Sequence, residues 1–151
     1  MNKQTRNIIN VSLTLVAIYL YSFTANNIET EIFGFNSFKF LISIAVLIQF
    51  LIFLPSFIFK TEKFYDLTGS LTYISVTSIA YFSLDNPTTT DTILFLYVVI
   101  WAGRLGIFLF RRINKVGKDV RFDKAKKKFF WFLQYWMGQA AWVVFTAGAS
   151  V

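Results

Sequence analysis

The 151-residue sequence contains neither cysteine nor histidine. The lack of cysteine excludes disulfides, thiolate metal sites and cysteine nucleophiles. The lack of histidine excludes a Ser-His-Asp triad, an imidazole base and a histidine-ligated zinc site. No metal site is therefore expected, and any catalysis must depend on tyrosine, carboxylate, lysine or arginine side chains, or on a cofactor.

Charged residues are also scarce, at 15% of the chain, whereas an ordinary soluble domain has about 25%. Hydrophobic residues make up 56% and aromatic residues 20%. A disordered chain is excluded, because such chains are poor in aromatics and rich in charge. The composition predicts a membrane protein, and the length predicts one domain, residues 1–151.

Five apolar runs of 16 to 21 residues follow one another along the chain. Each approaches the roughly 20 residues that a helix needs to cross about 30 Å of hydrocarbon. The expected fold is all-α, a polytopic membrane bundle with about five transmembrane helices. The runs are residues 8–23, 40–59, 67–84, 93–110 and 129–149.

The third run is the least apolar, because it carries seven serine and threonine residues. Their hydroxyls can donate to backbone carbonyls one turn earlier, so a helix remains favourable. Small polar residues also let neighbouring helices approach closely. This pattern predicts an interior helix that faces protein more than lipid.

Basic residues concentrate on one side of the five predicted spans. Thirteen of the fifteen lysines and arginines precede the first span or lie in the second-to-third and fourth-to-fifth connections. Spans that alternate in direction bring these three segments to one face, which the positive-inside rule makes cytoplasmic. We therefore expect an integral multi-pass protein with its N-terminus in the cytoplasm and its C-terminus outside.

Arg104 lies inside the fourth predicted span, six residues before the end of that span. The simpler interpretation is that its long side chain reaches the membrane interface and does nothing else. Alternatively, it is a buried cation that pairs with an acid or an anionic ligand. Trp101 and Arg111 fall on the same side of this helix, which favours the functional interpretation.

Asp66 opens the third span on the same cytoplasmic side. A carboxylate at a helix N-terminus interacts favourably with the helix dipole, which would explain Asp66 without any further role. It could equally be the counter-charge of Arg104, since both lie near one membrane depth and each would be costly alone. We therefore predict a contact between Asp66 and Arg104.

The connection 111–128 carries nine basic residues. Contact with anionic membrane lipids explains many of them. Asp119 and Arg121 differ, because they follow a glycine turn at Gly117 and alternate acid with base. Such a pair suits a phosphate or ribose site, where arginine forks onto phosphate and aspartate accepts from hydroxyls. Nucleic-acid binding is not expected, because these charges lie against a membrane.

The fifth span contains Gln134 and Gln139. Glutamines in an apolar helix usually form hydrogen bonds between helices. Gln139 and Trp142 are one turn apart, which predicts that they line a shared pocket.

In their order and spacing, these residues resemble the membrane-bound steroid 5α-reductase-like family, particularly its bacterial branch of unknown function. The resemblance covers about residues 60–145, although Lys118 stands where the family commonly has an acid. It rests on Trp101-x-x-Arg104-Leu105, Arg111, Gly117-Lys118-Asp119-x-Arg121-Phe122-Asp123, Gln134 to Trp142, and Phe64 to Ser70.

The resemblance implies a helical enzyme that uses NADPH to reduce a carbon–carbon double bond conjugated to a carbonyl in a lipid or sterol-like substrate. It places Arg104, Asp119 and Arg121 near the cofactor. It also implies that Asp66, Trp101 and Gln139 support or line the site. No proton donor follows from it, and Tyr65, Tyr73 and Tyr135 are candidates by chemistry alone.

Members of that family continue beyond the point where this sequence ends. We therefore expect the chain to be the N-terminal part of such a fold, inactive alone and in need of a partner with the C-terminal half. Two alternatives stay open. One is a non-catalytic membrane protein that uses Arg104 and the basic connection for lipid contact or assembly. The other is a methyltransferase, because the isoprenylcysteine methyltransferases resemble the same family and use S-adenosylmethionine.

Overall fold

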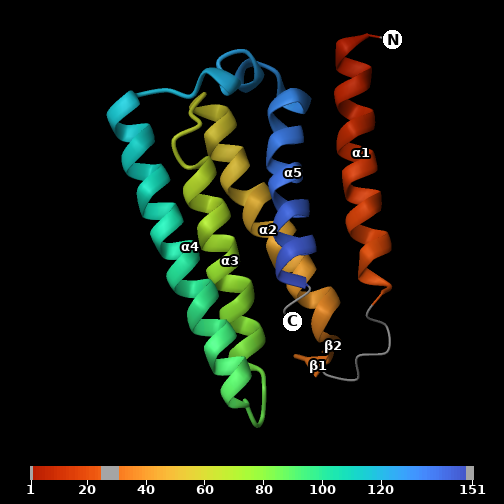
Figure 1. Ribbon diagram of the computed structural model, residues 1–151. Coiled ribbons are helices and arrows are strands. Elements are labelled where there is room, and N and C mark those ends of the chain that lie inside the picture. Colours follow the sequence, from red (N-terminus) through yellow and green to blue (C-terminus); the bar gives the residue numbers. More distant parts are fainter. Residues whose placement is uncertain (1, 25–30, 149–151) are drawn as a thin grey trace.

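The computed structural model describes residues 2–24 and 31–148 (Figure 1). Each apolar run forms a helix, so the predicted all-helical fold is confirmed; Ala149, the last residue of the fifth run, lies outside the described residues. A two-residue hairpin and two short 3₁₀ helices complete the structure. The elements are α1 Lys3–Ser22, β1 Glu31–Ile32, β2 Phe35–Asn36, α2 Ser37–Ile58, α3 Tyr65–Phe82, α4 Thr89–Val116, η1 Val120–Phe122, η2 Ala125–Lys127 and α5 Phe129–Ala147.

Local signals set the limits of α4, the longest helix. It begins with a capping box, in which Thr88 and Asp91 exchange side-chain and backbone hydrogen bonds. It ends at Gly117, whose φ of 86° lies in the left-handed region that glycine adopts without strain. The helix therefore continues past Phe110, where the apolar run stops, to Val116.

The helices run alternately up and down, with α4 at one edge of the bundle and α1 at the other (Figure 1). The helix α5 contacts α1, α2 and α3, whereas α4 packs chiefly on α3. This order leaves much of α4 without a protein neighbour among the described residues.

The hydroxyl-rich helix α3 occupies the interior position that its sequence predicted. It packs against α4, α2 and α5. The hydroxyls of Thr68 and Thr72 donate to carbonyls four residues earlier, both at 2.7 Å, which satisfies them within the helix. Thr72 also accepts a 3.0 Å hydrogen bond from the fully buried amide of Gln49 in α2.

All three basic segments lie at one end of the bundle (Figure 1). The start of α1, the α2–α3 connection and the α4–α5 connection all lie at this end, as the charge pattern predicted. The hairpin and the α3–α4 turn form the opposite end. We call the end with the basic segments the basic end, and the end with the hairpin the hairpin end.

Two of the described helices, α2 and α4, are long and apolar enough to cross a membrane. Only 11% of the most apolar stretch of α4 is buried within the protein. Most of its surface is therefore available to lipid or to another protein segment.

A close approach of α3 and α4 depends on Gly106. A Cβ atom at this position would lie 2.7 Å from the Cβ of Ser70. Gly106→Ala should therefore lower the free energy of unfolding by about 1–3 kcal/mol, because two helices must separate. Thermal unfolding in detergent measures the change.

Gly103→Ala is the matched control, because a Cβ there meets nothing within 4 Å. It should be neutral, or stabilising by up to about 1 kcal/mol through helix propensity. Equal destabilisation by both substitutions would contradict the predicted contact.

Candidate functional site

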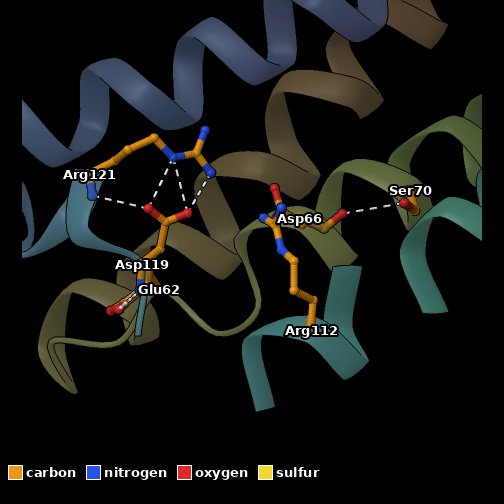
Figure 2. Close-up of polar contacts among 6 residues, drawn as sticks. All are labelled: Glu62, Asp66, Ser70, Arg112, Asp119 and Arg121. Carbon is orange, nitrogen blue, oxygen red and sulfur yellow. Dashed lines mark hydrogen bonds and ion pairs between the residues drawn. The ribbon is translucent and has the colours of Figure 1, made fainter. Parts of the chain in front are cut away.

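The carboxylate of Glu62 joins the two connections of the basic end. Its side chain is only 4% exposed and lies 2.7 Å from the ammonium of Lys126. Its other oxygen accepts a 3.0 Å hydrogen bond from the backbone N–H of Asp119 (Figure 2). Sequence analysis missed Glu62, because an acid between two lysines in a short connection looks like ordinary surface charge.

Phe122 anchors the connection between α4 and α5 by burying its ring among aromatic residues of α3 and α5. It is 1% exposed, and its ring lies 4.8 Å from the ring of Tyr65 and 4.9 Å from that of Tyr135. The hydroxyl of Tyr65 donates to the carbonyl of Tyr135 at 2.9 Å. Burial raises the pKa of Tyr65, so its hydroxyl stays protonated as a hydrogen-bond donor.

Asp119 and Arg121 form a close ion pair on this anchored connection. The Nε of Arg121 lies 3.0 Å from each carboxylate oxygen of Asp119, which also accepts from the Arg121 backbone N–H (Figure 2). Hydrogen bonds from Arg121 lower the pKa of Asp119, and the same bonds raise the pKa of Arg121. Both groups are therefore charged at neutral pH.

An open groove of about 410 Å³ lies over this pair. Arg112, Lys118, Asp119 and Arg121 line it, together with two apolar residues. Three bases and one acid line it, and two of these bases also have an acid partner outside the lining, Arg112 with Asp66 and Lys118 with Asp123. Guanidinium groups bind phosphate with two parallel hydrogen bonds, so Arg112 and Arg121 suit an anion.

The predicted contact between Asp66 and Arg104 is wrong. The carboxylate of Asp66 instead lies 3.8 Å from Arg112 (Figure 2). Because α4 extends to Val116, Arg112 belongs to this helix and comes level with Asp66. At 1.5 Å per residue, Arg104 lies about 12 Å deeper along the helix axis.

The structure does not bring Trp101 and Arg104 to the Asp119–Arg121 pair. Trp101 packs edge-to-face on Tyr73 of α3, with ring centres 5.2 Å apart. Arg104 is exposed and forms no ion pair with any described residue. Gly106 packs closely against α3, whereas Gly103 does not.

Gln139 and Trp142 do line a shared pocket, as their spacing predicted. This shallow pocket of about 310 Å³ also includes Tyr65, Gln134 and Tyr135. The side-chain oxygens of Gln134 and Gln139 are buried without a hydrogen-bond partner among the described residues. Tyr65 contributes to this pocket and also packs on Phe122 of the basic connection, so it links the two regions.

Gly69 makes room for Gln139. A Cβ atom at residue 69 would lie 2.5 Å from the amide nitrogen of Gln139. Any larger residue in this turn of α3 would displace the glutamine from its present position beside the pocket.

Comparison with known proteins identifies one family. Residues 52–150 match DUF1295, a family of proteins of unknown function. The chain belongs to this family. The DUF1295 segment contains Glu62, Asp66, Asp119, Arg121 and Gln139, so the whole candidate site lies within it. No curated protein and no solved structure matches the chain.

Asp66 gives the DUF1295 segment a pH-dependent stability. Burial raises its pKa above 3.8 despite the nearby Arg121 and Arg112. A folded-state pKa above the unfolded value means that the ionised carboxylate opposes folding. This cost is absent below about pH 4 and appears as pH rises through the folded-state pKa.

Asp66→Asn should therefore raise the melting temperature at pH 7 and leave it unchanged near pH 3.5. Thermal unfolding across this range measures the effect, with Asp85→Asn as the exposed control. A lower melting temperature for Asp66→Asn at pH 7 would mean that the ion pair with Arg112 outweighs the cost of burial.

Proposed function

We propose that this chain is a membrane-embedded, NADPH-dependent reductase-like protein that acts on a lipid or sterol-like enone. The proposal places all five helices across the bilayer, with the basic end and the N-terminus in the cytoplasm and the C-terminus outside. The gathering of three basic segments at one end supports this orientation.

The observation that carries the proposal is the juxtaposition of a basic groove with the α5 pocket. Arg112, Lys118 and Arg121 supply positive charge at the membrane surface. Tyr65 and Phe122 connect this surface to a pocket lined by Gln139 and Trp142 of α5. An anionic cofactor and an apolar substrate would thus approach one region from opposite sides.

The residues present fit the phosphate end of such a cofactor. The guanidinium of Arg121 is held by Asp119. The side chains of Arg112 and Lys118 are 49% and 65% exposed, so both can reach a ligand. Phosphate would be held by these bases, and Asp119 would accept from a ribose hydroxyl. NADPH, when bound, supplies the hydride for the reduction.

The pocket residues have separate roles in this proposal. Gln139 and Trp142 would line the substrate side of the site, and Tyr65 would hold Phe122 and the connection between α4 and α5 in place. Arg104 and Trp101 lie too deep for the same groove. The exposed Arg104 instead suits a contact with another protein segment, because an unpaired intramembrane arginine is costly.

The two alternatives differ in what they require of the groove. S-adenosylmethionine carries no phosphate, so three bases around one acid favour a dinucleotide over this methyl donor. The direct pairing of Asp119 with Arg121 favours a non-catalytic protein, because it neutralises two site residues without any ligand.

NADPH titration of the purified chain in detergent distinguishes these functions. Arg121→Gln should weaken NADPH binding by about tenfold or more, because a charge-assisted phosphate contact is lost. Lys124→Gln is the matched control: it removes an exposed charge from the same connection and should change affinity by less than about threefold. If the two substitutions weaken binding equally, NADPH is attracted only by the positive charge of the connection and not by a specific phosphate site. If the unmodified chain does not bind NADPH, the non-catalytic function is favoured.

A further inference from the structure

Arg104 lies near the middle of the fourth apolar run. That run covers residues 93–110, so the Cα of Arg104 is about 4 Å from its centre and about 9 Å from its end along the helix axis. Helix α4 is one of the two described helices that are long and apolar enough to cross a membrane. The proposed function places α4 across the bilayer, and Arg104 then starts well inside the hydrocarbon region.

Arg104 belongs to the side of α4 that faces away from the bundle. The buried residues of this helix, Ala102, Gly106 and Ile113, mark the side that packs on α3. At about 100° per residue, Arg104 lies roughly 160–200° around the helix from them. Because α4 forms an edge of the bundle, this side has no neighbouring helix among the described elements (Figure 1).

Exposed apolar side chains surround Arg104 on this side. They recur at the spacings of three and four residues that place side chains along one side of a helix. We call these residues, together with Arg104, the outer face of α4. They are Tyr97, Ile100, Trp101, Ile107 and Phe108, and their exposed fractions range from 46% to 75%.

The protein supplies no counter-charge for Arg104. This residue forms no ion pair with any described residue, and all eight acidic residues of the sequence lie outside the five apolar runs. An unpaired cation inside the hydrocarbon region is costly. A second copy of this chain cannot remove that cost, because it brings no carboxylate to the same depth.

A lipid phosphate is also poorly placed to pair with Arg104. Phosphates lie outside the hydrocarbon region, and the end of the apolar run is already about 9 Å away along the helix axis. A carboxylate on a neighbouring helix can lie at the same depth as the guanidinium. Arginine and carboxylate then pair through two parallel hydrogen bonds, which are strong where water is absent.

We propose that the outer face of α4 docks against a transmembrane helix of a partner protein that carries one aspartate or glutamate at the depth of Arg104. The carboxylate provides the ion pair that Arg104 lacks, and apolar side chains of the partner helix pack beside the exposed residues of the outer face. This inference rests on the transmembrane placement of α4 in the proposed function and is independent of NADPH binding.

A synthetic transmembrane peptide tests the proposal. The probe is a leucine–alanine helix with one central glutamate, and a peptide with glutamine in that place is the neutral comparison. Energy transfer between labelled peptide and the full chain, labelled at Asn86→Cys in phosphatidylcholine vesicles, measures association. The glutamate peptide should associate at least about tenfold more tightly, because only it can form the ion pair. Equal association of the two peptides would overturn the proposal.

Variants of the chain locate the contact. Arg104→Gln should remove the preference for the glutamate peptide, and Arg104→Glu should transfer the preference to a peptide with a central lysine. Arg111→Gln is the matched control, because this exposed arginine lies on the same side of α4 but beyond the apolar run. It should leave the preference within about twofold. Equal losses for Arg104→Gln and Arg111→Gln would mean that the peptide responds only to the charge of the basic end.

The depth of the carboxylate provides a further test. Moving the glutamate by seven residues along the peptide keeps it on the same helix face but shifts it by about 10 Å. The shifted peptide should lose most of the preference, and association as tight as that of the central-glutamate peptide would contradict a contact at Arg104. These results are separate from the NADPH titration, because the outer face of α4 does not line the basic groove.

Discussion

The buried carboxylate of Glu62 is the contact on which the arrangement of the basic end depends. An unpaired carboxylate at 4% exposure would cost several kcal/mol, so it persists only with the ammonium of Lys126 and the N–H of Asp119 in place. Both partners belong to the connection between α4 and α5. The contact therefore fixes the polar segment that carries Asp119 and Arg121 to the connection that precedes α3.

Charge divides the molecule into two chemically different ends. Bases surround the groove over Asp119, whereas Glu31 and Asp91 line a cavity at the hairpin end. Between them lie the helices, where the buried amide nitrogen of Gln49 in α2 donates to the hydroxyl of Thr72 in α3.

The helices were predictable because apolar runs near the length of a membrane span permit few other structures. The interior position of α3 followed from its hydroxyls, and the pocket beside Gln139 followed from helical spacing. The ion pairs were not predictable. The sequence predicted that the fourth helix ends at Phe110 and that Asp66 contacts Arg104. In the structure α4 continues to Val116 and Asp66 lies beside Arg112. An apolar run does not show where a polar extension of the same helix ends.

Glu62 illustrates a second limit of the sequence. Its two partners lie 57 and 64 residues later, and only the packed helices bring them together. Phe122 shows the same effect, since an aromatic residue among charges gives no sign of the Tyr65 and Tyr135 rings that enclose it. Helical content is a local property, whereas a site between connections depends on the order of the whole bundle.

Cysteine accessibility in a membrane tests the central claim, that both basic connections emerge on one side. The natural chain has no cysteine, so Lys63→Cys, Lys118→Cys and Asn86→Cys can each be labelled alone, with a membrane-impermeant maleimide on intact cells and on inverted vesicles. Residues 63 and 118 should react only in inverted vesicles, and residue 86 only in intact cells. Labelling of residues 63 and 118 from opposite sides would contradict the account.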